Sequence, residues 1–222
     1  MIGLGASISH LGRPLGAWRA FLGLRKSWLS REIVVFGALP PLAGTAAFGT
    51  WLGLPSRLIL AAYAGTLVVG LLGVFCSAMI YIDTQRDFWR GSRTFTRFFG
   101  TVATAAAFTW LVGTASYAAA LATVLGCGGL LAWDWLATQR ELRSPQLTRR
   151  QSARIQTERL PTWVSRRYRL GVAALIGASL VPLLGPFAAL AGALAMLASE
   201  LCSRLLYFKA VDAPKMPGGL AR

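Results

Sequence analysis

The stretch LILAAYAGTLVVGLLGVFCSAMIY, Leu58 to Tyr81, is the strongest indication of the fold class of this chain. It holds no charged side chain, and about 20 mostly apolar residues suffice to carry a helix across the hydrocarbon of a bilayer. The whole composition agrees, since 55% of the 222 residues are hydrophobic and only 14% are charged. Soluble domains average about 25% charged residues. The sequence therefore predicts an integral membrane protein.

Other apolar segments lie on both sides of this stretch, and each predicts a membrane helix. They are Ile33–Leu54, two helices within Phe98–Ala137, Leu170–Leu184 and Phe187–Phe208. We expect Pro40-Pro41 to kink or end the first helix, a division near Gly113-Thr114, and a second division at Gly185-Pro186. The predicted fold is an all-α, polytopic membrane helix bundle with about six transmembrane helices, forming a single membrane domain over residues 1–222.

Cationic side chains gather on one face of this predicted topology. With six crossings, 22 of the 23 lysines and arginines lie on the same face, and Arg57 lies on the other. The positive-inside rule places the cationic face in the cytoplasm. In a soluble protein, a net charge of +15 would indicate a nucleic-acid partner. Here topology and contact with anionic lipid headgroups account for it, so no nucleic acid is expected.

The longest polar stretch covers residues 138–169, between the fourth and fifth predicted spans. It is strongly basic, and Pro145 and Pro161 are expected to break helices there. We expect a basic loop. It could be a disordered connector or a docking surface for an acidic partner, and the sequence leaves both roles open.

The cysteine and histidine content argues against a metal centre. Cys76, Cys127 and Cys202 lie far apart in apolar segments and form no CxxC pair, so we expect buried apolar side chains rather than zinc or iron–sulfur ligands. A single histidine excludes a bis-histidine haem within this chain. No cofactor bound covalently or by metal ligation is therefore expected.

The only histidine, His10, lies in the basic segment SHLGRPLGAWRAFLGLRKSWLSREI, Ser9 to Ile33. An imidazole titrates at about pH 6.5 and can form a hydrogen bond with a ligand oxygen. A quinone ring would use such a donor, and a quinol would use the imidazole as a proton acceptor. A solvated or helix-capping histidine is the simpler alternative.

Two further segments combine polar and apolar groups at helix ends. In MIYIDTQRDFW, Met79 to Trp89, an aromatic belt with an Asp–Arg pair is the simple interpretation. Glu200 and Arg204 lie four residues apart in the last span, which favours an intramembrane ion pair. We expect Asp134, between two tryptophans, to lie at the membrane interface without a functional role.

Taken in order, HLGRPLGAWRAF, SWLSREI, MIYIDTQRDFW, SELCSRLLYF and APKMPG resemble the membrane-anchor subunit of the dimethyl sulfoxide reductase family. The resemblance extends over nearly the whole chain. It implies a helical membrane-anchor subunit that is not itself catalytic. Such anchors hold a molybdopterin catalytic subunit and an iron–sulfur subunit at the bacterial inner membrane. They oxidise menaquinol or ubiquinol as an exchangeable substrate and pass the electrons to the iron–sulfur subunit.

The resemblance also implies a quinol site. The family histidine corresponds to His10, and the expected quinol-binding residues are His10, Arg13, Arg19, Glu32, Tyr81 and Arg86. Full-length members have two helices before the HLG motif, whereas this chain begins just ahead of it, so we expect the first two helices to be missing. Well-known members face the periplasm with their catalytic subunits. The charge distribution here favours a cytoplasmic partner.

Two other functional classes are compatible with a small membrane bundle. One is a transporter, with Glu200 and Arg204 lining a path. It predicts repeated, interrupted helices, and the sequence contains no such repeat. The other is a scaffold that tethers soluble subunits without contacting quinone. In every case, the terminal substrate belongs to the chemistry of another subunit.

Overall fold

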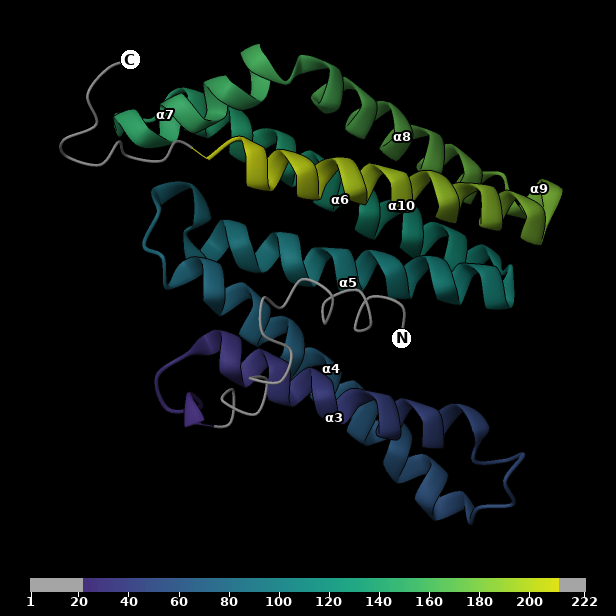
Figure 1. Ribbon diagram of the computed structural model, residues 1–222. Helices are drawn as coiled ribbons and strands as arrows, with labels where there is room; N and C mark the ends of the chain where they lie inside the picture. The colour runs from purple at the N-terminus through teal and green to yellow at the C-terminus, as the bar shows by residue number, and fades with distance from the viewer. Residues whose placement is uncertain (1–21, 212–222) are drawn as a thin grey trace. The chain divides into compact units, whose positions relative to one another are not determined.

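The computed structural model describes residues 22–211, which are helical and contain no strand (Figure 1). This confirms the predicted all-α class. The chain divides into two compact units, residues 1–85 and residues 86–222. We call them the first unit and the second unit.

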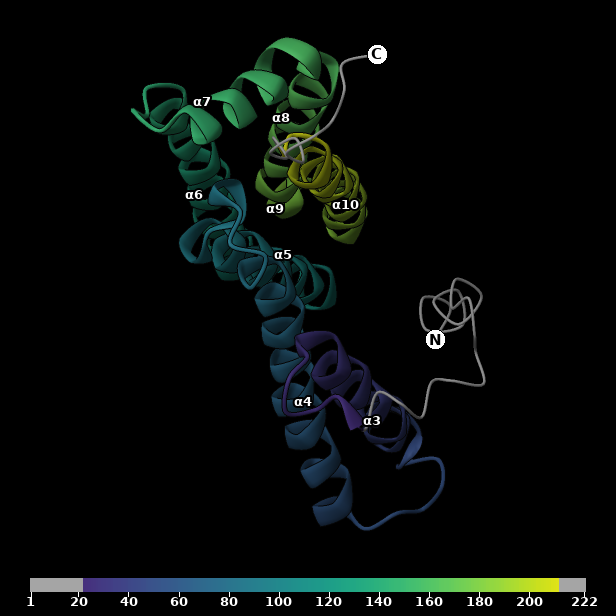
Figure 2. The ribbon, with the colours of Figure 1, turned by 60° about the vertical axis from the view of Figure 1, so that its left-hand side comes forward.

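The described part of the first unit is mainly a pair of packed helices, α3 (Trp28–Phe48) and α4 (Ser56–Ile82), visible in Figures 1 and 2. Helix α4 contains the uncharged apolar stretch that predicts a membrane protein. The Phe36 ring packs over Gly73, where an added Cβ would lie 2.6 Å from the ring. A glycine in α4 thus lets the two helices approach closely.

Helix α3 continues through Pro40 and Pro41, so of the two expected effects, a kink or an end of the helical turns, these prolines do not end the helix. Each proline removes one intrahelical hydrogen bond. The remaining turns of α3 keep theirs, and α3 packs along α4. Membrane helices tolerate proline where neighbouring helices support the backbone in this way.

Four long helices form the second unit: α5 (Gly91–Thr114), α6 (Tyr117–Leu142), α8 (Pro161–Ser179) and α10 (Pro186–Lys209). Helix α5 packs against α6 and α10, and α8 packs against the same two helices, so the four close into a bundle. Its apolar core includes Phe108, Leu111, Leu131 and Met196. The short helices of this unit are η2 (Asp87–Trp89), α7 (Leu147–Arg154), η3 (Ile155–Arg159) and α9 (Val181–Leu184).

Both predicted divisions between apolar helices are present, the first shifted slightly. Helix α5 ends at Thr114, and Ala115 adopts a left-handed φ of 46°. The Ser116 hydroxyl then caps α6 by accepting a hydrogen bond from the Ala119 amide at 3.2 Å. Gly185, with φ of +64°, separates α9 from α10, a conformation that glycine adopts at low cost.

Helices α8 and α10 lie side by side in both views (Figures 1 and 2). Two glycines face each other at this contact. An added Cβ on Gly177 would lie 2.9 Å from the Gly192 Cα atom. Small residues allow such close approach between membrane helices, where packing rather than the hydrophobic effect drives association.

Four described helices are long and apolar enough to cross a membrane, namely α4, α5, α6 and α10. The sequence predicts about six. The other two predicted segments are also helical, as α3 and as α8 followed by α9. Charged residues lower the hydropathy of both, because α3 begins near Arg31 and Glu32, and the first half of α8 is rich in arginine. The protein is therefore a multi-pass membrane protein.

The basic segment 138–169 is largely helical rather than a loop. Helix α6 extends to Leu142, α7 and η3 fill residues 147–159, and Pro161 begins α8. Proline is well suited to the first turn of a helix, where its missing N–H has no partner to lose. Ala153 and Gln156 are buried, so this segment is a folded part of the second unit.

The three cysteines are free and buried. Cys76 lies in α4, Cys127 in α6 and Cys202 in α10. This confirms that they act as small apolar side chains.

Candidate functional site

The residues predicted to bind quinol fall into three groups. His10, Arg13 and Arg19 lie outside the described residues. Glu32 and Tyr81 lie in the first unit, and Arg86 begins the second, where its guanidinium lies 5.0 Å from the Trp89 ring centroid. The structure therefore brings Glu32 and Tyr81 to the same region of one unit.

Glu32 lies near the start of α3, and Tyr81 lies near the end of α4. The Ser77 hydroxyl donates a hydrogen bond to the Glu32 carboxylate, and Tyr81 follows Ser77 one turn later on α4. Because the two helices are packed antiparallel, their contact places the carboxylate and the phenol at the same end of the first unit.

An aromatic and cationic cluster lies at this same end. The Trp28 ring meets the Phe75 ring edge-on, with 5.8 Å between centroids. The Arg31 guanidinium lies 4.1 Å from the Trp28 centroid, and its Nε donates to the Leu24 carbonyl at 2.8 Å. Glu32 therefore lies beside an aromatic platform and a fixed cation, a combination able to hold a polar aromatic ring.

The second unit contains a buried ionic cluster centred on Asp134, which is 3% exposed. Its carboxylate accepts from Arg97 at 2.6 Å and lies 3.2 Å from the Arg167 guanidinium. The two flanking tryptophans do not predict this burial within the bundle. Adjacent helical residues point about 100° apart, so Asp134 faces the bundle while Trp135 is 50% exposed.

Further hydrogen bonds fix this cluster. Arg97 donates to both the carbonyl and the hydroxyl of Ser203, each at 3.0 Å. The Tyr168 hydroxyl donates to Asp134 at 3.3 Å. Tyr168 lies in the arginine-rich start of α8, where burial and then the Asp134 charge raise its pKa to about 12. The phenol therefore stays protonated and remains a donor.

A second buried ion pair joins Arg93 to Glu141. Arg93 also donates to Gln156 at 3.2 Å, and its guanidinium lies 4.3 Å from the Phe88 ring centroid. Both ionic clusters lie near the starts of α5 and α8 and the ends of α6 and α10. The buried charges are thus concentrated at one end of the bundle, which we call the charged end.

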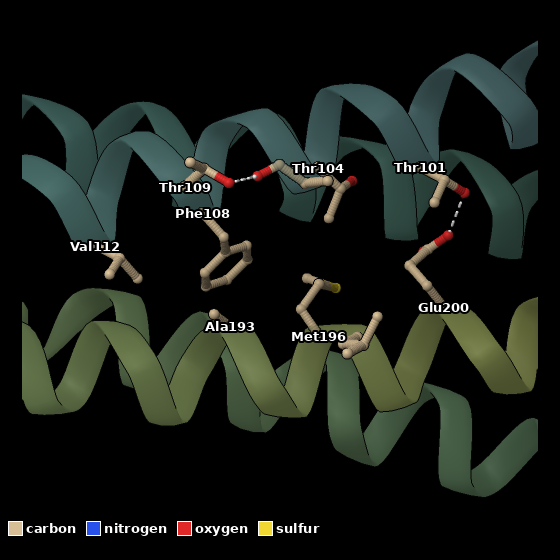
Figure 3. Close-up of a pocket in the computed structure, with 10 residues that line it drawn as sticks. Thr101, Thr104, Phe108, Thr109, Val112, Ala193, Met196 and Glu200 are labelled. Atoms are coloured by element: carbon tan, nitrogen blue, oxygen red, sulfur yellow. Dashed lines mark hydrogen bonds between the residues drawn. The ribbon is translucent and has the colours of Figure 1, made fainter. Parts of the chain in front are cut away.

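A cavity of about 320 Å³ lies between α5 and α10 (Figure 3). Thr104, Phe108 and Met196 are buried side chains that form its floor, while Thr109 and Leu197 belong to its exposed rim. The lining is mostly apolar. The cavity therefore opens sideways from the bundle and suits an apolar molecule.

Glu200 lies at one end of this cavity and points toward Thr101 on α5 (Figure 3). The Thr101 hydroxyl is 2.6 Å from Glu200 Oε2 and 3.4 Å from Arg204 Nη2. The sequence favours a direct ion pair between Glu200 and Arg204, whereas in the structure the Thr101 hydroxyl lies between the two side chains. Arg204 also lies over the Phe98 ring, 4.0 Å from its centroid.

A smaller cavity of about 20 Å³ shares Thr101, Thr104 and Glu200 with the larger one. Arg97, Asp134 and Arg167 line it from the other side. This volume is enough for about one water molecule. Glu200 therefore lies between an apolar cavity and the Asp134 cluster, an arrangement that sequence reasoning missed.

Comparisons with known proteins agree with the helical membrane architecture. A family model described as DMSO reductase anchor subunit (DmsC) matches residues 1–126. A sulfite dehydrogenase subunit of Allochromatium vinosum is 38% identical over 86 residues, covering 37% of this chain and 26% of that relative. The match thus spans about a quarter of the relative's length, and no solved structure matched the chain. Because the family model covers more than half of the sequence, this chain belongs to the DMSO reductase anchor subunit family.

Proposed function

We propose that this chain anchors a molybdopterin- and iron–sulfur-containing oxidoreductase in the bacterial inner membrane and supplies it with electrons from menaquinol or ubiquinol. The observation that carries the proposal is the family match over residues 1–126. That range contains every residue predicted to bind quinol. The matched relative is, by its name, also a subunit of a dehydrogenase.

The geometry of the first unit supports a quinol site at the end of α3 and α4 that carries Glu32. A quinol is an aromatic ring with two hydroxyl donors. The Glu32 carboxylate supplies an acceptor, and Trp28 and Tyr81 supply aromatic surface. His10 is the proposed proton acceptor, because a neutral imidazole can take a proton near neutral pH.

Oxidation of one quinol to quinone releases two protons and two electrons. In the proposed complex, His10 accepts one of the two protons, the other is released to water at the membrane surface, and the two electrons pass to the iron–sulfur subunit. The redox chemistry of the terminal substrate belongs to cofactors of the partner subunits. This chain itself binds the quinol, orients it and holds the complex at the membrane.

The distribution of cationic residues favours one orientation in the membrane. In the proposed topology, the cationic face lies in the cytoplasm, and the partner subunits dock there. Helix α7, with the sequence LTRRQSAR, is part of this face and carries three arginines. It offers an acidic partner a folded basic surface.

The test of quinol chemistry is His10→Gln in the complete complex. Removing a general base typically lowers turnover about 100-fold or more, so we expect quinol-dependent turnover to fall by that factor while the subunits still co-purify. Arg57→Gln, on the opposite predicted face, is the matched control and should retain activity. Unchanged turnover in His10→Gln would contradict the role of His10.

Purification in mild detergent separates this proposal from its alternatives. A redox anchor should carry molybdenum, iron and quinone with it. A tethering scaffold would carry the metals but show no response to added quinol. A transporter would carry neither metal, and that result would overturn the proposed function.

A further inference from the structure

We infer that the cavity between α5 and α10 is a second ligand site, which binds the hydroxylated ring of a lipid-soluble molecule through a hydrogen bond from the ring hydroxyl to Glu200. The quinol has this chemistry, so the identity of the ligand rests on the proposed function. The location is new, because the cavity and Glu200 lie in the second unit and Glu200 is not among the residues expected to bind quinol.

The size and lining of the cavity select the ligand class. Its volume of about 320 Å³ is at the lower end of the range typical of small-molecule sites, about 300–1,000 Å³. Its floor is apolar apart from the threonine hydroxyls, and its rim residues Ala105, Thr109 and Leu197 are exposed. Because α5 and α10 are membrane-spanning candidates, a ligand that enters sideways comes from the hydrocarbon. It must therefore be lipid-soluble.

Glu200 determines which polar group the ligand presents. Oε2 accepts a hydrogen bond from Thr101, while Oε1 makes no hydrogen bond to any residue in the described part of the chain. A carboxylate is an acceptor only, so the matching ligand group is a donor. A hydroxyl on the ring meets this requirement, whereas a quinone carbonyl or an ether oxygen does not.

Thr101 holds the Glu200 carboxylate in place at the end of the cavity. The threonine hydroxyl is 2.6 Å from Glu200 Oε2 and 2.8 Å from the Arg97 carbonyl. It has one proton to donate. When Thr101 donates that proton to Glu200, Oε2 has a partner within the protein and Oε1 remains for a ligand.

The direction of the cavity matches an amphipathic ligand. Glu200 lies toward the charged end of the bundle, near Arg204 and the Asp134 cluster, and Val112 lies at the opposite end of the cavity (Figure 3). The hydroxylated ring would face Glu200, and an apolar tail would extend past Phe108 toward Val112. This orientation keeps the polar group near the membrane surface and the tail in hydrocarbon.

Photolabelling of the full chain in its purified complex tests the location. An azido-naphthoquinol should label peptides containing residues 101–112 and 193–200, in addition to the N-terminal segment. Labelling confined to the N-terminal segment would overturn the second site and leave the proposed function intact. Labelling nowhere would overturn both. A photoreactive alkyl chain is the control. If it labels the same peptides to the same extent and added naphthoquinol does not reduce that labelling, the cavity is a lipid groove and the second site is overturned.

Variants test the role of Glu200. Glu200→Ala should weaken naphthoquinol binding at this site about tenfold or more, since a hydrogen bond to a charged group is lost. The dimethyl ether of the same ring, which has no donor, should bind equally to both proteins. Glu200→Gln keeps an acceptor oxygen and should show a smaller loss. Equal effects on the two ligands, or no effect of Glu200→Ala, would overturn the inference.

Filling the cavity provides a control that does not depend on Glu200. Ala193 faces Phe108 across the cavity (Figure 3), so Ala193→Leu should weaken binding of both naphthoquinol and its dimethyl ether. Ala191 is exposed on the same helix and outside the cavity lining. Ala191→Leu should leave both affinities unchanged. If Ala193→Leu binds both ligands normally, the cavity is not the site.

Discussion

The two units of this protein use different means to hold membrane helices together. In the described part of the first unit, the buried residues are small and uncharged, such as Ala62, Gly73 and Cys76. The second unit buries three arginines and two acids within its helices, namely Arg93, Arg97, Arg167, Asp134 and Glu141. One unit is joined by close apolar packing, and the other also by ion pairs.

The difference shows where charge is tolerated in a membrane bundle. An isolated charge in hydrocarbon is costly, and such residues pair with one another or face the bundle interior. Asp134 is shared by two guanidiniums, and each hydrogen bond has a defined direction. Sliding one helix along another would break these pairs. We therefore expect the ionic clusters to fix the register of the four helices. The small apolar contacts of the first unit fix helix register less strictly.

The largest effect should come from breaking the Asp134 cluster. Asp134→Ala leaves Arg97 and Arg167 buried without their shared anion. Removing one partner of a buried ion pair costs about 3–5 kcal/mol, so the free energy of unfolding in detergent should fall by that amount. Asp134→Asn retains an acceptor oxygen and should be less harmful.

The matched control is an exposed ion pair in the same unit. Glu158 lies 3.9 Å from Arg154, and its side chain is 68% exposed. Glu158→Ala should change the free energy of unfolding by less than about 0.5 kcal/mol. Equal destabilisation by Asp134→Ala and Glu158→Ala would show that the buried cluster does not hold the bundle.

An intermediate effect should come from the glycine contact between α8 and α10. In Gly177→Ala, the new Cβ meets the Gly192 Cα atom at 2.9 Å, and backbone atoms cannot move aside. We expect a loss of about 1–3 kcal/mol. Gly126→Ala in α6 meets nothing within 4 Å and should be neutral or stabilising by up to about 1 kcal/mol.

A glycine-to-alanine substitution at the helix contact of the first unit allows the packing of the two units to be compared directly. In Gly73→Ala, the close neighbour is the Phe36 ring, the end of a side chain. The ring can shift, so Gly73→Ala should cost less than Gly177→Ala when both are measured by chemical unfolding. A larger loss at Gly73 would indicate that the first unit is the more tightly packed of the two.

The smallest effect should come from the polar contact of the first unit. Ser77→Ala removes the hydroxyl that donates to Glu32. Interhelical hydrogen bonds in membranes are worth about 0.6 kcal/mol on average, so we expect a loss of about 0.5–1.5 kcal/mol. Ser179 bonds only to the carbonyl one turn before it at 2.9 Å, and Ser179→Ala should have little effect. If Ser77→Ala and Ser179→Ala lower the free energy of unfolding equally, the hydrogen bond from Ser77 to Glu32 does not stabilise the contact between α3 and α4.

Two acidic residues of similar context lead to different predictions from the sequence. Glu200 stands out because it is an ionisable residue within an apolar span, whereas the tryptophans that flank Asp134 favour the membrane interface. The structure places both acids on the small cavity that contains Arg97 and Arg167. Asp134 is also an ionisable residue within an apolar segment, as Glu200 is. Its neighbouring tryptophans, however, favour a position at the membrane interface and so lead away from a buried site.

The predicted quinol-binding role of His10 rests on a different kind of evidence from the predictions for Glu200 and Asp134. The role of His10 comes from motif order, and the family match over residues 1–126 supports the family but does not test the histidine. Of the expected helpers, Glu32 and Tyr81 come together on α3 and α4, while Arg86 belongs to the second unit. The residues 86 and 81 are close in sequence, yet the boundary between the units falls between them.

The helical membrane class of this protein follows from its amino-acid order alone, because uncharged runs of this length can satisfy their backbone only as helices in hydrocarbon. The positions of the helix breaks and the family resemblance follow from the same local patterns. Which charges are buried, and which partners they meet, depends instead on tertiary packing. Arg97, Asp134 and Arg167 are brought together from three helices, and the cavity that ends at Glu200 exists only where α5 and α10 pack. Such contacts depend on how helices rotate and pack against one another, and no local pattern of residues specifies that.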